Sequence, residues 1–208
     1  MKIVCLSDTH GMHDQVEVPD GDLLIHAGDL TNCGELEQVA SFNAWLGRLP
    51  HAHKVVIAGN HDFCFEDTPQ IAEPLVTNAD YLIDSSVKVD GVTIYGSPWQ
   101  PRFCDWAFNL NRGAELRRKW DLISPDTDIL VTHGPARGYG GETIGGDDAG
   151  CEELLAALHR IRPRLHVFGH IHEGYGLYQN DHTSLLNTSI CTIDYEPSNP
   201  PLVYDWIQ

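Results

Sequence analysis

The chain has 208 residues, enough for one domain with an ample core, and its 42% hydrophobic and 21% charged residues are ordinary for a folded protein. Its formal net charge of −17 argues against a nucleic-acid polymer or an anionic membrane surface as partner, because both attract Lys and Arg. A small phosphate ester is not excluded, since bound metal cations can reverse the local potential.

Five short apolar runs predict buried strands, and each run ends abruptly in a cluster of Asp, Asn or His. In chain order they cover residues 2–10, 22–29, 54–62, 128–134 and 165–172. Further strands are expected at residues 86–90, 92–96, 184–194 and 202–207. The dipeptide Asp90-Gly91 predicts a tight turn between the first two of these.

Helical periodicity predicts amphipathic helices between the strands, at residues 35–49, 113–122 and 151–161. Strands alternate with helices early in the chain but not later. This order favours an α/β fold of two packed mixed β-sheets flanked by helices over a single doubly wound sheet. No repeat, linker or low-complexity tract is visible, so we expect residues 1–208 to form a single domain.

The spacing of the cysteines and the lengths of the apolar runs indicate the cellular compartment. The six cysteines show no CxxC or paired spacing, which favours reduced thiols over a disulfide framework. The first strand begins at Lys2, which leaves no room for a signal peptide, and no apolar run approaches the roughly 20 residues that span a bilayer. We therefore expect a soluble, cytoplasmic protein.

Two stretches resist regular structure. Residues 97–112 carry four aromatic side chains and two Arg, and residues 134–150 hold seven glycines. Both follow predicted strands at the edge where the carboxyl ends of parallel strands meet, which is where ligands bind in α/β proteins. We expect both stretches to wall a site.

Hard oxygen and imidazole donors lie at or just beyond the predicted strand ends. They are Asp8, His10, Asp29, Asn60, His133, His170 and His172. A single such motif is more often an ordinary surface or core arrangement, but five in order favour a metal site. Mixed O/N donors suit Mn, Fe, Zn or Co. Seven ligands exceed the needs of one tetrahedral zinc and fit two metals about 3.5–4 Å apart that share a carboxylate.

The motifs Asp8-Thr9-His10, Gly28-Asp29, Gly59-Asn60-His61-Asp62, His133-Gly134 and Gly169-His170-Ile171-His172 resemble the five signature blocks of the calcineurin-like metallophosphoesterase superfamily. The resemblance implies the αββα sandwich of that family and two divalent transition-metal ions, manganese first, with iron, zinc or cobalt as alternatives. It assigns Asp8, His10 and His172 to the first metal. It assigns Asn60, His133 and His170 to the second, with Asp29 bridging.

Two departures from the pattern argue against a protein phosphatase and against a purple acid phosphatase. Protein phosphatases of this superfamily carry an Arg shortly after the second-block Asp, whereas Asp29 is followed by Leu-Thr-Asn-Cys-Gly. Purple acid phosphatases place a Tyr three residues after that Asp, where this chain has Asn32. The segments at 42–50, 132–138 and 162–176, and NPPLVYD near the end, are most similar to the small MPPED-type metallophosphoesterases.

The expected reaction is phosphoester hydrolysis by a metal-bridging hydroxide, because two metals lower the pKa of the water between them. The resemblance assigns His61 to protonation of the leaving oxygen, a role that suits imidazole. Asp62 either orients His61 or caps the turn. We expect a phosphodiesterase acting on nucleotide-like or other small phosphodiesters. The alternatives are a phosphomonoesterase and a nucleotide- or phosphate-binding scaffold of weak activity. A zinc amidohydrolase is also considered, but Asn60 and the GNHD block fit it poorly.

Substrate contacts are sought in residues 97–112. Aromatic side chains there can stack on a nucleobase, and an Arg can fork onto a phosphate. The residues considered are Trp99, Arg102, Phe103, Trp106, Phe108 and Arg112. The alternative is that the aromatic residues pack this loop onto the domain. We expect a monomer or a small homo-oligomer with a small phosphodiester or nucleotide substrate, and no nucleic-acid polymer or membrane as partner.

Overall fold

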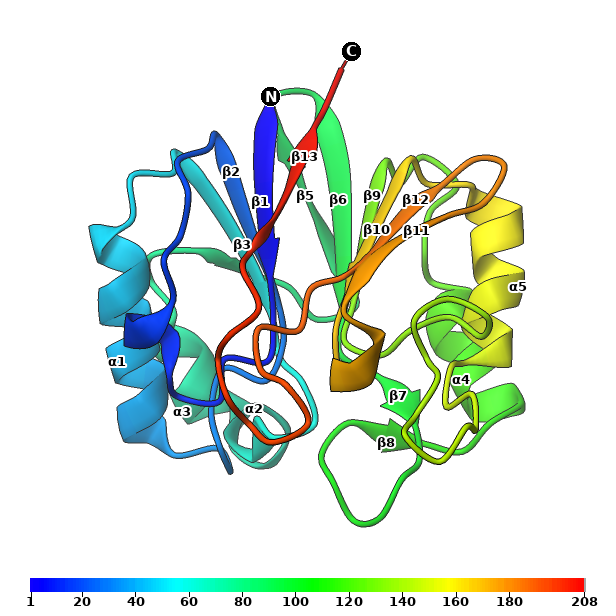
Figure 1. Ribbon diagram of the computed structural model, residues 1–208, viewed down its shortest axis with the longest axis horizontal. Coiled ribbons are helices and arrows are strands. Elements are labelled where there is room, and N and C mark those ends of the chain that lie inside the picture. The colour runs from blue at the N-terminus through cyan, green and yellow to red at the C-terminus, as the bar shows by residue number, and fades with distance from the viewer. Residues whose placement is uncertain (208) are drawn as a thin grey trace.

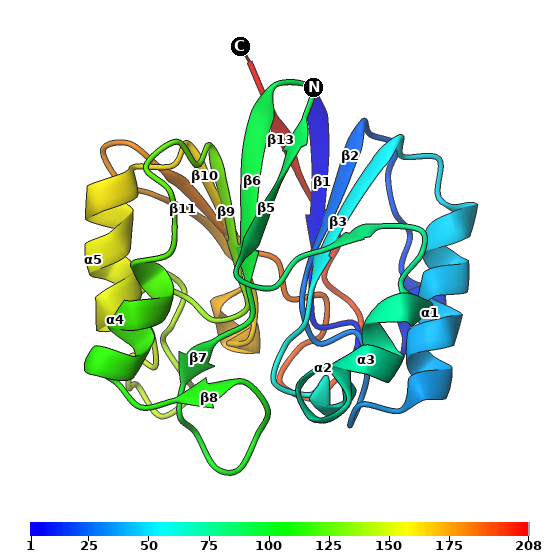
Figure 2. The ribbon, with the colours of Figure 1, turned by 180° about the vertical axis from the view of Figure 1, so that it is seen from behind.

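Two mixed β-sheets face each other in the computed structural model, which describes residues 1–207, and helices cover the outer face of each sheet (Figures 1 and 2). The expected αββα sandwich is therefore confirmed. The cysteines are all free, and Cys5 lies in the core. Among the described residues, no helix has the length and apolarity needed to cross a bilayer.

The first sheet has the strand order β13-β1-β2-β3-β4. Strands β1 to β4 are parallel, and β13 pairs antiparallel with β1. The bounds are β1 Lys2–Leu6, β2 Leu23–Ala27, β3 His53–Ile57, β4 Asp80–Tyr81 and β13 Leu202–Asp205.

The second sheet has the order β11-β12-β10-β9-β6-β5. Its four central strands are parallel, and β11 and β5 are antiparallel edges. The bounds are β5 Ser85–Val89, β6 Val92–Ser97, β9 Ile129–Thr132, β10 Leu165–Phe168, β11 Gly176–Gln179 and β12 Ser184–Asn187. A separate pair, β7 (Gln100–Pro101) and β8 (Asn109–Leu110), lies in the 97–112 stretch.

Helices α1 (Leu36–Arg48), α2 (Phe63–Asp67) and α3 (Pro69–Ala72) lie beside the first sheet, and α4 (Ala114–Trp120) and α5 (Glu152–Ile161) cover the second (Figure 1). Single 3₁₀ turns occur at η1 His13–Gln15, η2 Glu73–Leu75 and η3 His172–Gly174. The acidic first turn of α5 complements its helix dipole, and the left-handed Arg162 followed by Pro163 ends the helix.

Alternating side chains of each central strand enter two different cores, because successive residues point to opposite faces of a sheet. In β1, Ile3 and Cys5 pack between the two sheets, and Val4 and Leu6 pack toward α1. The outer face of the second sheet packs against α4 and α5 in a third cluster. Burial on both faces explains why these strands are continuously apolar rather than alternating.

Most predicted elements are confirmed, and the differences are one shortened strand and several short elements. The Asp90-Gly91 turn joins β5 to β6, and both of its residues have positive φ. The strand expected over 184–194 ends at Asn187, and residues 188–201 form no helix or strand. Strands β4, β7, β8 and β11 and the short helices α2 and α3 were not predicted, because their segments are too short for periodicity to show; β7 and β8 correct the expectation that residues 97–112 are wholly irregular.

Candidate metal centre

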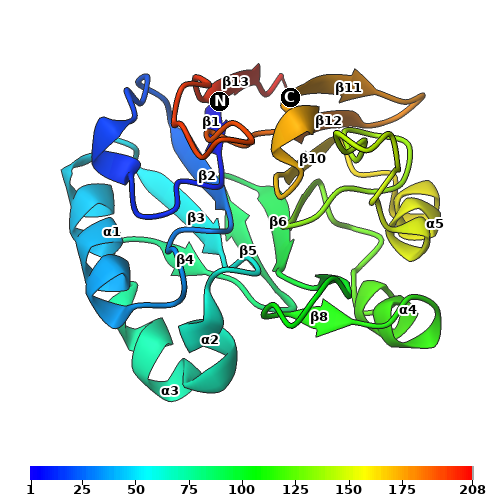
Figure 3. The same ribbon diagram turned by 60° about the horizontal axis from the view of Figure 1, so that its bottom comes forward.

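All seven predicted ligands gather where the parallel strands of both sheets end, on the side that comes forward in Figure 3. Asp8 and Asp29 each follow their strand by two residues, and His133 follows β9 directly. Left-handed φ values of 55° at Asp8, 57° at Asp29 and 71° at His170 turn the chain sharply there. Backbone of this kind is rare outside Gly and clusters at functional sites.

The first group comprises Asp8, His10 and His172, as the resemblance implied. The Nε2 atom of His172 lies 3.5 Å from Asp8 Oδ1 and 3.4 Å from His10 Nε2. These three side chains come from the ends of β1 and β10, which belong to different sheets. The fold, rather than one local segment, therefore assembles this group.

The second group is built around His133. Its Nε2 atom lies 3.4 Å from Asp29 Oδ2 and 2.8 Å from Asn60 Oδ1, and its ring centroid is 5.0 Å from that of His170. Asp29 Oδ2 also lies 3.8 Å from His10 Nε2 of the first group. Asp29 thus stands between the two groups, where a bridging carboxylate would stand.

Backbone carbonyls orient two of the imidazoles. His133 Nδ1 donates to the carbonyl of Ala27 at 2.9 Å, and His172 Nδ1 donates to the carbonyl of Thr192 at 2.9 Å. A carbonyl only accepts, so Nδ1 keeps its proton, and whenever the ring is neutral the lone pair on Nε2 faces the site. This arrangement is the usual support of metal-binding histidines.

Charge in the site favours a cation. Burial opposes protonation of His133 and His172, but the neighbouring carboxylates outweigh it and raise the pKa of each imidazole to about 9. Burial likewise opposes ionisation of Asp29, yet the surrounding imidazoles, His133 first, hold its pKa well below the usual range. Two ionised carboxylates among clustered imidazoles therefore attract positive charge.

The donor set fits divalent transition-metal ions. The imidazole-to-carboxylate distances among the predicted ligands, 3.4 to 3.8 Å, exceed those of good hydrogen bonds and suit donors arranged around a common ion. His10 Nδ1 is buried and has no hydrogen-bond partner among the described residues. Carboxylate, amide and imidazole donors without thiolate match Mn, Fe, Co or Zn.

Glycines leave room for the carboxylates. A Cβ at Gly169 would lie 2.1 Å from Asp8 Oδ2, and a Cβ at Gly59 would lie 2.3 Å from Asp29 Oδ1. Asp8 is held further by Ser189 Oγ, which donates to Oδ2 at 2.9 Å, and by the backbone N–H of His170. The glycines of the GNHD and GHIH motifs are therefore required by close packing.

His61 lies beside the second group. Its Nε2 atom is 4.0 Å from Asp29 Oδ2, and its Nδ1 donates to the carbonyl of Asn32 at 2.6 Å. The ring of Trp106 packs on the imidazole at 4.2 Å between centroids and 31° between planes. These contacts hold His61 with Nε2 toward the carboxylate.

Asp62 does not make the expected contact with His61. Its carboxylate accepts hydrogen bonds from the backbone N–H groups of Gly59, Leu30 and Thr31 and from the Thr31 hydroxyl, at 2.8 to 3.2 Å. Four donors from two loops capture the buried side chain. Asp62 therefore ties the loop after β2 to the loop after β3, which agrees with the second of its two expected roles, capping the turn, and not with orienting the imidazole.

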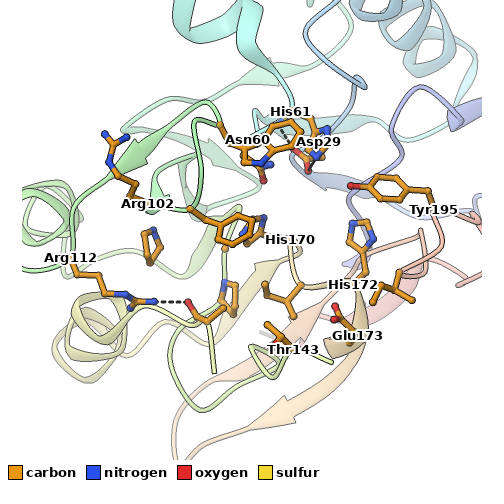
Figure 4. Close-up of a pocket in the computed structure, with 18 residues that line it drawn as sticks. Asp29, Asn60, His61, Arg102, Arg112, Thr143, His170, His172, Glu173 and Tyr195 are labelled. Carbon is orange, nitrogen blue, oxygen red and sulfur yellow. Dashed lines mark hydrogen bonds and ion pairs between the residues drawn. The ribbon is translucent and has the colours of Figure 1, made fainter. Parts of the chain in front are cut away.

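A cavity of about 380 Å³ opens over the two groups (Figure 4). Both irregular stretches contribute to its wall, as the sequence predicted: Arg102, Phe103 and Arg112 from the first, and Thr143 and others from the second. The Arg112 guanidinium donates to the carbonyls of residues 149 and 150, both at 2.8 Å, and so joins the two stretches.

Trp99 is wrongly predicted as a substrate contact, since it lies outside the cavity wall. Its indole N–H donates to Asp84 Oδ2 at 3.0 Å, Lys119 Nζ lies 4.1 Å from its ring centre, and Phe108 packs edge-on. A partly buried indole needs an acceptor for its N–H, and Asp84 supplies one. Trp99 and Phe108 pack the loop onto the domain, which is the alternative that the sequence left open.

Tyr195 lines the cavity and was not predicted. Its ring centroid lies 4.8 Å from that of His10 and 5.3 Å from that of His172. The residue lies in the irregular 188–201 segment, beyond the range expected as a strand, and no motif marks it. Only the path of the chain brings it to the site.

The sandwich fold and the paired donor groups at its strand ends define a metallohydrolase. The chain belongs to the calcineurin-like phosphoesterase family, whose model matches residues 1–174. The resemblance of the five motifs is thereby confirmed, and the protein is a metal-dependent phosphoester hydrolase.

The particular relatives are of the MPPED type. The chain is 46% identical to human metallophosphoesterase domain-containing protein 1, over 98% of this chain and 70% of that protein. It is 40% identical to the UPF0046 protein T07D4.2 of Caenorhabditis elegans, over 99% of this chain and 60% of that protein. The crystal structure of TT1561 of Thermus thermophilus shares the fold, with a TM-score of 0.59, 13% identity and coverage of 89% of this chain and 88% of that one.

Proposed function

We propose that the protein hydrolyses small phosphodiesters, nucleotide-like ones among them, with two divalent transition-metal ions, manganese foremost. The observation that carries this proposal is the position of Asp29 between two donor groups at the floor of the cavity. A cavity of about 380 Å³ is within the range of small-molecule sites, which favours a small ester over a polymer.

The seven donors would hold the ions in two sets. Asp8, His10 and His172 form one set, Asn60, His133 and His170 form the other, and Asp29 serves both. When bound, the ions supply Lewis-acid activation of water and neutralise charge that grows on the phosphoryl oxygens.

His61 would protonate the leaving oxygen. Its Nδ1 proton is committed to the carbonyl of Asn32, so a proton available for transfer is the one on Nε2 of the imidazolium form. Packing on Trp106 keeps that nitrogen toward Asp29 and the floor of the cavity. Proton donation by a fixed imidazole suits the departure of an alkoxide or phenoxide.

The apolar part of the wall favours a diester, which carries a second ester group, over a monoester. Among the described residues, Arg102 and Arg112 are the only Lys or Arg side chains that line the cavity. The Arg112 guanidinium donates to two backbone carbonyls, which fix its position in the wall while its positive charge remains. Phe103, 63% exposed, and Trp106 offer apolar surface to a second ester group.

Hydrolysis of bis-p-nitrophenyl phosphate and p-nitrophenyl phosphate by purified protein with added Mn²⁺ tests the proposal. We expect faster cleavage of the diester, abolished by EDTA. Faster cleavage of the monoester would replace the proposal by a phosphomonoesterase. A protein that holds two ions per chain but cleaves neither ester would act instead as a binding module.

A further inference from the structure

Tyr195 stands over the site in a segment that is fastened to the metal-binding strands. The 188–201 segment crosses from the second sheet to the first on the side of the strand carboxyl ends (Figures 1 and 3). Its start is bonded to the end of β1: Ser7 N–H donates to Thr188 O and Ile190 N–H donates to Ser7 O, both at 3.0 Å. Farther along, Asn199 donates from its backbone and side chain to the carbonyls of residues 190 and 189 at 3.0 Å.

One turn of this segment forms hydrogen bonds with both His172 and Tyr195. The carbonyl of Thr192 accepts from His172 Nδ1 and from the backbone N–H of Tyr195, both at 2.9 Å. Thr192 N–H in turn donates to Glu196 O at 2.9 Å. The backbone that sets the orientation of a metal-binding imidazole thus also fixes the position of the tyrosine.

The backbone of Tyr195 is strained, and its side chain is not needed for the core. Its φ of 58° is rare for an aromatic residue, and such conformations persist where surrounding contacts impose them. The side chain remains 46% exposed while its ring meets those of His10, His172 and His61 at 4.8 to 6.2 Å. Core packing alone does not account for such a side chain.

The hydroxyl of Tyr195 is directed into the cavity, toward the Asp29 carboxylate (Figure 4). It has no hydrogen-bond partner among the described residues. A tyrosine hydroxyl is an O–H donor at neutral pH. Phe103 and Trp106 line the same cavity, so a ligand over the metal groups would contact Tyr195 within an aromatic wall.

We propose that Tyr195 is a substrate-binding residue, whose hydroxyl donates a hydrogen bond to a non-bridging phosphoryl oxygen of the bound ester. This proposal rests on the proposed function, since it assumes a phosphate at the metal groups. The ring forms part of the cavity wall. No covalent step involves the phenol, which remains protonated throughout.

The test compares Tyr195→Phe with the wild type and with Tyr204→Phe. Tyr204 lies in β13, packs against Trp206 and does not line the cavity, so it is a matched control. Three quantities are measured on Mn²⁺-loaded proteins: kcat/KM for bis-p-nitrophenyl phosphate, the Kd of inorganic phosphate by calorimetry, and the metal content.

For Tyr195→Phe we expect kcat/KM to fall and the phosphate Kd to rise by about 10- to 100-fold, the usual effect of losing one hydrogen bond to a charged oxygen. Metal content and the control variant should not change. Unchanged phosphate binding in Tyr195→Phe would overturn the proposal, and loss of metal would place the phenol in the metal site instead. If the wild type cleaves no ester, the proposed function fails, and phosphate binding still decides the role of Tyr195.

Discussion

Substitution of Gly169 by Ala should weaken metal binding while the protein still folds. Gly169 precedes His170, and an added Cβ would lie 2.1 Å from Asp8 Oδ2 and 2.2 Å from Ser7 Oγ. Ordinary contact begins at 3.4 Å, so the carboxylate or the loop must move by about 1.3 Å. Asp8 cannot yield freely, because Ser189 Oγ and the His170 N–H both hold it.

The size of the effect follows from the tolerance of metal sites. Ligand distances must stay within about 0.2 Å of their ideal values, so a displacement near 1.3 Å removes Asp8 as an effective ligand. We expect the affinity of the first metal group to fall by at least about 10- to 100-fold. The metal-free protein should lose about 1–3 kcal/mol of unfolding free energy from overpacking.

The assay is metal content after dialysis against a buffered series of Mn²⁺ concentrations, with circular dichroism to verify folding. Gly145→Ala is the matched control, because the nearest atom to its added Cβ is Thr143 Oγ1 at 3.7 Å. A folded Gly169→Ala protein that binds two ions with wild-type affinity would refute both the packing argument and the role of Asp8.

Three further outcomes are expected. His61→Ala should keep both ions and lose about 10²- to 10⁴-fold in kcat, and loss of metal would show that His61 is a ligand or structural instead. Asp62→Ala should lower the unfolding free energy by at least about 1–3 kcal/mol, because buried N–H donors such as that of Thr31 lose their acceptor. Denaturant titrations measure this loss, and unchanged stability would contradict the expectation. Burial lowers the pKa of His166 from 6.5 to about 3. Below pH 6.5 the unfolded chain therefore binds a proton that the folded chain does not, and the unfolding free energy decreases as the pH is lowered. Between pH 7 and pH 5 the EDTA-treated wild type should lose about 2 kcal/mol more than His166→Gln in urea titrations, and equal losses would show that His166 does not contribute.

Much of the fold could be predicted because its signals are local. The buried strands are continuous apolar runs, and the predicted helix at 35–49 corresponds to α1 at Leu36–Arg48. The donors could be predicted for the same reason, since each stands where such a run stops. Parallel strands bring their carboxyl ends to one edge, so Asp8, Asp29 and His133 were expected to meet before any distance was known.

Other parts depend on contacts between distant residues, which no local pattern encodes. The carbonyls of Ala27 and Thr192 orient His133 and His172 because β2 and the 188–201 segment pass beside those imidazoles in the folded chain. The sequence does not distinguish the aromatic residues of the 97–112 stretch, but Trp99 is held away from the cavity by the hydrogen bond from its indole N–H to Asp84.

The sequence by itself determined the family through the resemblance of its five motifs, and it determined the donor set and the layered fold through strand ends and periodicity, which are local signals. Only the tertiary structure decided that Asp62 ties two loops, that Trp106 rather than Trp99 reaches His61, and that Tyr195 faces the metal groups. The physical reason is the same in each case: a side chain takes the partner that folding brings within reach, and that choice is made across the whole chain.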